Sequence, residues 1–389
     1  MNSINFRNTN RWNVFINMFS GNILPVNSDE SELSLLSIIY AIFTWIIILI
    51  HVCTCTVGIF RVSLESALRN STSNLIISTE ILFNLSHMYS QRYLLKRLID
   101  NYDYLLSSDN ELLKNTVVSY IRPIEKLLKF YTMTEVCMAV LWVSRPLLTV
   151  YQKEQFVHED YVLPISVTNE PISRNIFIIS VILEIFGLGY LIMKKVSTDI
   201  YRLHLILLLT SQYKYLRIQM GMIFQRDNNF MKHQNVDKEL NSLLRHHSIV
   251  VQATNTLKKL LSFSVCIIHL DSVLRFCFLS YMLVEVNHFS FMEGCVIISY
   301  AIVAILQIYM ICFYIQELLE AGSNLTEDAF YEGWYSCELP VKQKFKVIMF
   351  TNKMKCQLSY CENVDLNLPS FVQIISQAYS MCLLLLKFK

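Results

Sequence analysis

Residues Leu368–Lys389 read LPSFVQIISQAYSMCLLLLKFK, a stretch long enough to cross a bilayer as one helix. Its polar residues recur every three or four positions: Ser370, Gln373, Gln377 and Ser380. On a helix they form one narrow stripe, which Leu384 and Lys387 extend. Because lipid offers no hydrogen-bond partner, this stripe either packs against another helix or lines a water-filled pore.

The composition indicates a membrane protein. The chain has 389 residues, of which 53% are hydrophobic and 16% charged. Seven apolar runs approach or exceed the length of a membrane span: Leu33–Val57, Ser71–Ser90, Tyr131–Tyr151, Asn175–Met193, Leu260–Val284, Phe291–Tyr314 and Leu368–Leu386. The second run is the weakest, since polar residues interrupt it. The sequence therefore predicts an all-α membrane protein with seven transmembrane helices.

The basic residues between the spans predict the orientation. Alternate connections hold 25 Lys and Arg on one side of the membrane and 6 on the other. By the positive-inside rule, the N-terminus is cytoplasmic and the C-terminus extracellular. Seven spans in this orientation are the reverse of a G-protein-coupled receptor.

The spans divide the chain into four parts. Residues 1–32 form a cytoplasmic arm, and residues 33–315 hold the first six spans, with a long helical extension at 194–259. Residues 316–366 form a cytoplasmic anchor segment in which Pro340 is expected to break the helix. Residues 367–389 form the seventh span. The extensions of spans four to seven are expected to build a helical bundle below the membrane, and the outer loop Gln152–Arg174 is expected to be acidic and irregular.

No reactive constellation predicts an enzyme, a metal or a cofactor. The zinc-protease, phosphate-loop and nucleophile-elbow motifs are absent, and the 11 cysteines show no disulfide or zinc spacing. The adjacent His246 and His247 are interpreted as solvated surface. Nothing in the sequence predicts a nucleic-acid partner.

Charges inside predicted spans are costly and mark function or pairing. Glu80, Arg145 and Glu184 lie in the middle or outer parts of three spans. They either anchor a ligand in a pocket or close the bundle as ion pairs. Asp271 and Arg275, one turn apart, are expected to pair on their own helix.

Aromatic residues gather near the outer ends of the spans. They predict an apolar pocket for a small volatile or lipophilic ligand, or else an interfacial belt with ordinary core packing. The candidates for the pocket are Glu80, Phe83, Trp142, Arg145, Phe177, Glu184, Phe186, Tyr281 and Tyr300.

The C-terminal 70 residues resemble the insect odorant receptor family. Three pieces in order carry the resemblance: LTEDAFYEGWY at 325–335, Leu339-Pro340 before a basic amphipathic helix, and FVQIISQAYS at 371–380 leading into a leucine run. Upstream, the length, the seven spans and the inverted orientation agree with that family.

The resemblance implies an odorant-gated, non-selective cation channel. It implies four subunits joined through a cytoplasmic anchor, one central pore lined by the seventh span, and an odorant pocket in each subunit. It also implies a tuning subunit that forms a heterotetramer with a shared co-receptor, in the lipid of the plasma membrane of olfactory neuron dendrites.

Mapped onto this chain, the resemblance places the pore constriction at Leu384 and Phe388, with Gln373, Gln377 and Ser380 along the wall. Lys387 departs from the glutamine that the co-receptor and the gustatory receptors carry. It either faces the pore mouth, where four lysines would repel cations, or extends outward to lipid headgroups. The departure favours a tuning subunit.

Asn70 begins an Asn-Ser-Thr glycosylation site in the first predicted outer loop. Two alternatives for the function remain. One is a gustatory-type receptor of the same architecture, whose last-helix motif is altered here. The other is a secondary transporter, although the spans show no inverted repeat.

Overall fold

The computed structural model describes residues 4–27, 34–63, 67, 72–108, 110–161, 163, 169–225, 233–284, 291–327, 330, 334–336, 338–355 and 367–387. Its helices are α1 (Phe6–Thr9), α2 (Arg11–Phe19), α3 (Leu35–Ile59), α5 (Thr72–Ser90), α6 (Arg92–Leu106), α7 (Glu111–Gln152), α8 (Arg174–Gln225), α9 (His233–Val284), α10 (Phe291–Ser323), α12 (Leu339–Lys355) and α13 (Leu368–Lys387). Three short 3-10 turns, His158–Asp160, Asn324–Thr326 and Trp334–Ser336, and two short strands, β1 (Gln155–Phe156) and β2 (Ile172–Ser173), complete the described fold.

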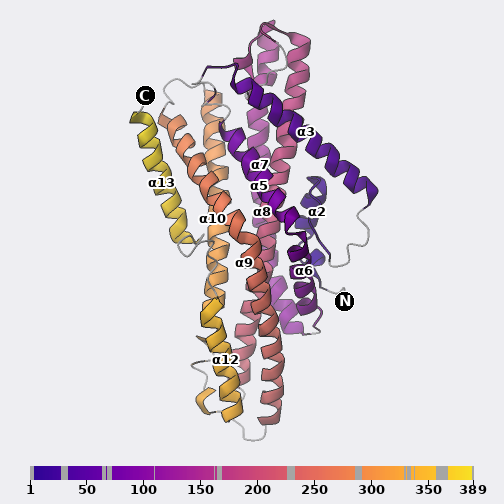
Figure 1. The fold of residues 1–389 in the computed structure, drawn as a ribbon, viewed down its shortest axis with the longest axis vertical. Coiled ribbons are helices and arrows are strands. Elements are labelled where there is room, and N and C mark those ends of the chain that lie inside the picture. Colours follow the sequence, from indigo (N-terminus) through magenta and orange to yellow (C-terminus); the bar gives the residue numbers. More distant parts are fainter. Residues whose placement is uncertain are drawn as a thin grey trace.

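Long helices run along the molecule and form one elongated bundle (Figure 1). α8 and α9 have 52 residues each and α7 has 42, so each extends well past the roughly 20 residues that a bilayer requires. The helical extension predicted from Lys194 therefore continues the fourth span as one helix as far as Gln225. α13 lies along the edge of the bundle and packs on α9 and α10.

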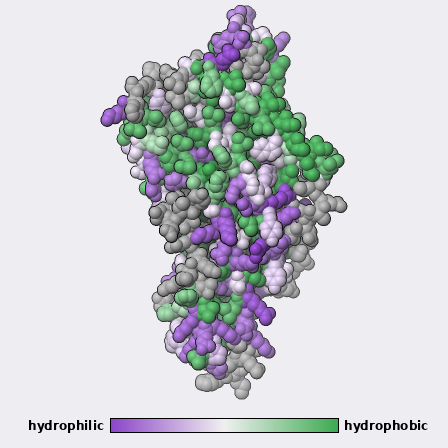
Figure 2. Space-filling model, viewed as in Figure 1, coloured by the Kyte–Doolittle hydropathy of each residue, from purple (hydrophilic) through white to green (hydrophobic). Residues whose placement is uncertain are grey.

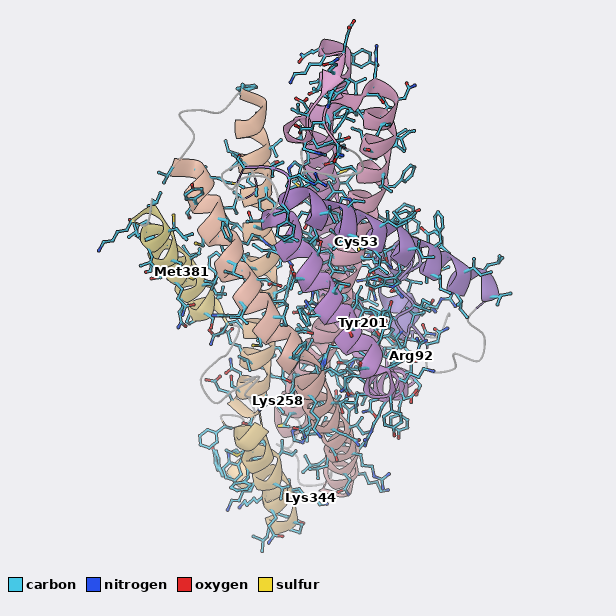
Figure 3. All side chains as sticks on the ribbon, turned by 45° about the horizontal axis from the view of Figure 1, so that its top comes forward. Cys53, Arg92, Tyr201, Lys258, Lys344 and Met381 are labelled. Carbon is cyan, nitrogen blue, oxygen red and sulfur yellow. The ribbon has the colours of Figure 1, made fainter. Side chains whose placement is uncertain are left out.

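α8 is the central column of the bundle. It packs on α2, α3, α5, α7, α9 and α10. Between Leu203 and Leu209 its side chains are buried all round, as expected of a helix with no solvent-facing side. Tyr201 lies inside the bundle in Figure 3 and donates a hydrogen bond to the carbonyl of Pro25 at 2.7 Å, which ties the N-terminal segment to this column.

Six of the described helices are long and apolar enough to cross a bilayer: Leu35–Ile59, Glu111–Gln152, Arg174–Ile223, Lys238–Val284, Gly294–Thr326 and Leu368–Lys387. The space-filling view shows apolar residues in a broad band across the upper part of the molecule, between hydrophilic residues at the tip and below (Figure 2). These features and the helical content confirm the predicted class of all-α membrane protein.

α5, the second predicted span, is less apolar for a structural reason. Its polar residues Asn74, Ser78, Glu80 and Asn84 are all buried within the protein. A helix that turns its polar groups toward neighbouring helices satisfies the bilayer constraint with fewer apolar residues. The second run is therefore less apolar in the sequence because this helix turns a polar side toward the protein interior.

Two local expectations are wrong. The outer loop is not simply irregular, because β1 and β2 pair antiparallel and cover a small core of Phe156, Tyr161 and Phe177. Pro340 does not break a helix. It is the second residue of α12, in the first turn, where a missing N–H leaves no helical hydrogen bond unmade.

The contact of α3 with α8 depends on Gly187. A Cβ at this position would lie 2.4 Å from Cβ of His51 on α3, whereas a Cβ at Gly189 would meet nothing within 4 Å. We expect Gly187→Ala to destabilise the protein by about 1–3 kcal/mol through overpacking. Gly189→Ala is the matched control and is expected to be neutral or slightly stabilising. Thermal unfolding of both detergent-purified variants checks this, and equal melting temperatures would contradict the assigned close approach.

Candidate functional site

Six ionisable side chains gather in the interior of the bundle. They come from α5, α7, α8 and α9: Glu80, Glu135, Lys195, Asp199, Arg202 and Arg275. Each side chain is only 1–4% exposed. We call this set, with Tyr131 and Gln307, the charge network.

One half of the charge network links α5, α9 and α10. Arg275 donates to Glu80 at 2.5 Å and to the side-chain oxygen of Gln307 at 2.5 Å. Gln307 in turn donates to the second carboxylate oxygen of Glu80 at 3.0 Å. The three side chains form a closed triangle in which both oxygens of Glu80 are satisfied.

The other half links α7 and α8. Tyr131 lies within 2.9 Å of a carboxylate oxygen of Asp199 and of Glu135, and Lys195 pairs with Glu135. Arg202 donates to Asp199 at 2.6 Å. Gln307 joins the two halves, because its amide nitrogen also donates to Asp199 at 3.0 Å.

The charge network holds three carboxylates and three cations, so its formal charge is zero. Burial of an unpaired charge costs several kcal/mol, and partners with good geometry offset that cost. The network joins five helices, α5 and α7 to α10, and its members offset one another's cost of burial.

The charges are not paired as the sequence predicted. Glu80 pairs with Arg275. The side chain of Arg145 lies outside the described residues. The predicted pair of Asp271 with Arg275 is wrong, since Arg275 is directed to Glu80 and Gln307. Glu184 lies apart and accepts a hydrogen bond from the backbone N–H of Leu163 at 3.0 Å.

Two of the candidate aromatic residues meet. The rings of Trp142 on α7 and Tyr300 on α10 lie 5.6 Å apart, and the side chains are 7% and 4% exposed. Trp142 follows Glu135 by seven residues, and Tyr300 precedes Gln307 by seven. At 1.5 Å per residue, the backbone at Trp142 and Tyr300 lies about 10 Å along the helices from Glu135 and Gln307, on the outer side in the predicted orientation. Tyr300 still interacts electrostatically with Arg275, so the aromatic pair borders the charge network.

The other aromatic candidates lie elsewhere. Phe83 and Phe186 are 51% and 56% exposed, so they face outward from the bundle. Phe177 belongs to the small core under the β1–β2 pair, where it stacks on Phe156 at 4.1 Å. Tyr281 is half-buried against the main core.

α13 presents two different sides. It buries Ser370, Ile374, Ala378 and Cys382 against the bundle. The remaining described members of the stripe, Gln373, Gln377, Ser380, Leu384 and Lys387, are exposed on this chain. Figure 3 shows Met381 at the periphery of the molecule. Ser370 is therefore separated from the stripe to which the sequence assigned it, and Phe388 lies outside the described residues, as does Asn70.

The histidine pair differs from its interpretation as solvated surface. His247 is buried, and His246 is partly buried with Nε2 at 3.0 Å from the side-chain oxygen of Gln212. Its ring also lies 5.1 Å from that of Tyr215. The two residues pack α9 against α8 in the extended part of the bundle.

Sequence reasoning missed most of the charge network. Glu135 lies within the predicted third span, and its position alone was a signal. Lys195, Asp199 and Arg202 were counted with a cytoplasmic segment, although their spacing of four and three residues places them on one helical face. Lys194, Lys195 and Arg202 are all buried. When these three are left out of the count, the excess of Lys and Arg still lies on the same side of the membrane, so the predicted orientation is unchanged.

Comparison with known proteins identifies the class. The family model described as "7tm Odorant receptor" matches residues 63–379, so the chain belongs to this family of seven-helix receptors, which are not enzymes. Among curated proteins, it is similar to Odorant receptor 94a of Drosophila melanogaster, with 26% identity over 166 residues, and to Odorant receptor 67c of the same species, with 24% over 158. These matches cover 41% and 39% of this chain, and 42% and 38% of the two relatives.

Solved structures show the same fold over nearly the whole length. The insect olfactory receptor OR5 from Machilis hrabei superposes with a TM-score of 0.81 at 15% identity, covering 97% of both chains. The same receptor in complex with eugenol gives a TM-score of 0.79 at 17% identity, covering 99% of both.

We expect substitutions in the buried charge network to lower the free energy of unfolding much more than a substitution in an exposed ion pair. We expect Arg275→Gln to cost about 3–5 kcal/mol, because it leaves Glu80 charged and buried. Glu80→Gln should cost a comparable amount. Their combination, which removes both charges, should cost less than the sum of the two.

Glu125→Gln is the control, because Glu125 pairs with Lys129 at 2.9 Å on the exposed side of α7. This substitution should lower the free energy of unfolding by less than about 1 kcal/mol. Thermal unfolding of the purified variants measures all four. Strict additivity of the two buried substitutions would contradict the triangle.

Proposed function

We propose that the protein is the odorant-binding subunit of a ligand-gated, non-selective cation channel in the plasma membrane of olfactory neurons. Membership of the odorant receptor family supports the class of function. The proposal that the protein forms part of a channel rests on one observation. α13 buries Ile374, Ala378 and Cys382 on its own bundle and leaves the polar stripe outward. Within the chain, Gln377 lies 3.3 Å from Nε2 of His269 on α9, and Ser380 donates to the carbonyl of Ser376. These contacts leave unused part of the hydrogen-bonding capacity of the glutamine side chains, which lipid cannot satisfy, so we place this side against water or other subunits.

The odorant site lies beside Trp142 and Tyr300. Their large, flat apolar faces suit a small lipophilic molecule, and the charge network, which reaches Tyr300 through Arg275, limits how deep such a molecule penetrates. A fold neighbour was solved with eugenol bound, which supports a ligand of similar size and polarity.

The pore forms where four copies of α13 meet. Gln373, Gln377 and Ser380 line its wall, and Leu384 and Phe388 narrow it, so that apolar side chains gate by excluding water. The long inner parts of α8, α9 and α10, with α12, supply the surface through which the subunits join. The partner subunits are the shared co-receptor, and the N-terminus faces the cytoplasm.

Substitutions at the aromatic pair test the ligand site. We expect Trp142→Ala and Tyr300→Ala to raise the half-maximal odorant concentration about tenfold or more, since each removes an aromatic contact surface. Phe83→Ala on α5 and Phe186→Ala on α8 delete exposed rings away from this pair and should change the half-maximal concentration less than about twofold. Odorant-evoked currents in cells that co-express the co-receptor provide the measurement. Unchanged ligand ranking and sensitivity in both buried variants would place the site elsewhere.

Lys387 predicts weak conduction by the subunit alone. Four lysines at one pore mouth repel cations, and co-receptor subunits dilute that repulsion. We expect little odorant-evoked current from the subunit expressed alone, and about a tenfold increase in Lys387→Gln. Lys259→Gln, an exposed change on α9, is the control. Robust current from the unmodified subunit alone would contradict this role for Lys387.

A further inference from the structure

An apolar groove of about 740 Å³ lies between α2, α3, α7 and α8, away from the aromatic pair. Its two ends differ in polarity. At one end lie Lys129, Trp12 and Thr132, where the Lys129 ammonium is 5.6 Å from the Trp12 ring and the indole N–H donates to Thr132 at 3.3 Å. The wall at the other end is apolar, with Val143 and Phe186.

The length of the groove matches a lipid chain. Lys129 and Val143 are 14 residues apart on α7, or about 21 Å along the helix. One leaflet of the hydrocarbon core is about 15 Å thick. An acyl chain therefore fits along the groove, with its polar end near Lys129.

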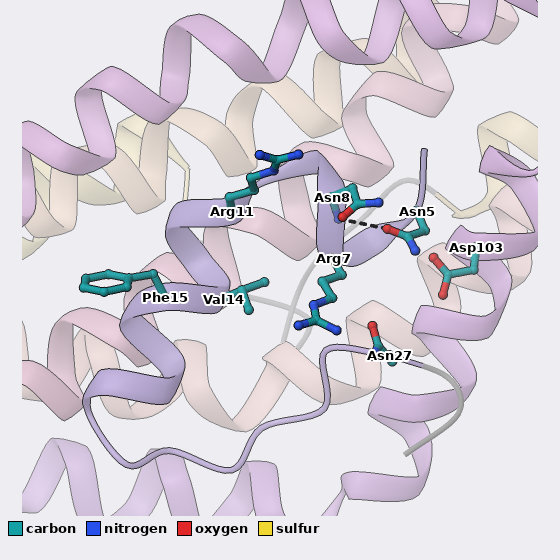
Figure 4. Close-up of a pocket in the computed structure, with 8 residues that line it drawn as sticks. All are labelled: Asn5, Arg7, Asn8, Arg11, Val14, Phe15, Asn27 and Asp103. Carbon is teal, nitrogen blue, oxygen red and sulfur yellow. Dashed lines mark hydrogen bonds between the residues drawn. The ribbon is translucent and has the colours of Figure 1, made fainter. Parts of the chain in front are cut away.

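A second, polar hollow of about 690 Å³ adjoins the groove at Phe15, which lines both. Figure 4 shows Arg7 directed toward Asn27 and Arg11 on the other side of the turn between α1 and α2. Asp103 is the acid among the described residues that line the two hollows. It accepts the backbone N–H of Phe6 at 2.7 Å, and burial raises the pKa of its carboxyl. Of the described ionisable residues that line the two hollows, Arg7, Arg11 and Lys129 are basic and Asp103 is acidic, with Asp100 close to Asp103.

α2 has the character of a helix that lies at a membrane surface. Phe15, Met18 and Phe19 are exposed on it, and the rings of Trp12, Phe15 and Phe19 follow one another at 5.3 and 6.0 Å. Aromatic side chains of this kind concentrate at the boundary between headgroups and acyl chains.

We infer that the groove and the polar hollow form one binding site for an anionic glycerophospholipid. One acyl chain lies in the groove, and the phosphate and its anionic headgroup lie beside Lys129 and Arg11. In the predicted orientation this site faces the cytoplasmic leaflet, where anionic lipids concentrate. Glu125 pairs with Lys129 at 2.9 Å on the exposed side, so the lipid competes with that carboxylate. The site is independent of the odorant site.

Native mass spectrometry of the purified full-length protein tests this site. The probes are phosphatidylserine and phosphatidylcholine with identical acyl chains. We expect phosphatidylserine to bind more tightly, and Lys129→Gln and Arg11→Gln each to weaken it about fivefold. Lys126→Gln, an exposed change one turn earlier on α7 that lines neither hollow, should leave the affinity unchanged.

Gly189→Leu tests the groove itself. Gly189 lines the groove, and a side chain there enters open space, so the variant should fold and yet block the acyl chain. We expect it to reduce binding of both lipids at least fivefold. Equal affinity for the two lipids, or equal effects of Lys129→Gln and Lys126→Gln, would overturn the inference. So would a Gly189→Leu variant that shifts odorant sensitivity with lipid binding intact, because the groove would then hold the odorant.

Discussion

The structure depends on the mutual neutralisation of buried charges in the charge network. A bilayer supplies no hydrogen-bond partner, so each ionised side chain at this depth must find one inside the protein. Glu80, Arg275 and Gln307 meet this requirement as a triangle, and Asp199 connects them to the rest of the network. Five helices are thereby joined at one level by groups far apart in the sequence. Hydrophobic packing in lipid could not fix their relative positions in the same way, because lipid tails are as apolar as leucine.

The same constraint explains the contrast between α5 and α13. α5 turns its polar side into the protein, where the charge network and its neighbours accept it. α13 does the opposite, since it buries its small and apolar residues and leaves glutamine and serine outward. One polar helix side is therefore turned into the protein, and the other is exposed on this chain. α9 and α10 carry Arg275, Tyr300 and Gln307 and also form the surface on which α13 packs. These two helices are the direct physical connection between the proposed odorant site and the proposed pore.

Much of the fold follows from local pattern. Apolar runs place α3, α5, α10 and α13 close to their observed ranges, because length and apolar character are properties of neighbouring residues. For α7 the apolar run predicts only the part from Tyr131 onward, and the helix begins 20 residues earlier, at Glu111. Contacts between residues far apart in the sequence do not follow from local pattern. The sequence shows that Glu80 requires a cation, but it does not show that Arg275, 195 residues away, supplies it. For the same reason Trp142 and Tyr300 come together while Phe177 and Phe186, equally aromatic, lie apart from them. His247 illustrates the reverse case, in which a polar residue in a basic helix is buried by a neighbouring extension that composition does not reveal.

The most direct measurement concerns the two sides of α13 in the open channel. Single cysteines at Gln377, Ser380 and Ile374, in a background without the exposed Cys53 and Cys137, can be treated with a membrane-impermeant thiol reagent during odorant application. We expect rapid modification and altered current at positions 377 and 380, and none at the buried position 374. If positions 377 and 380 stay sealed from water while the channel conducts, the outward polar side of α13 does not line the ion path.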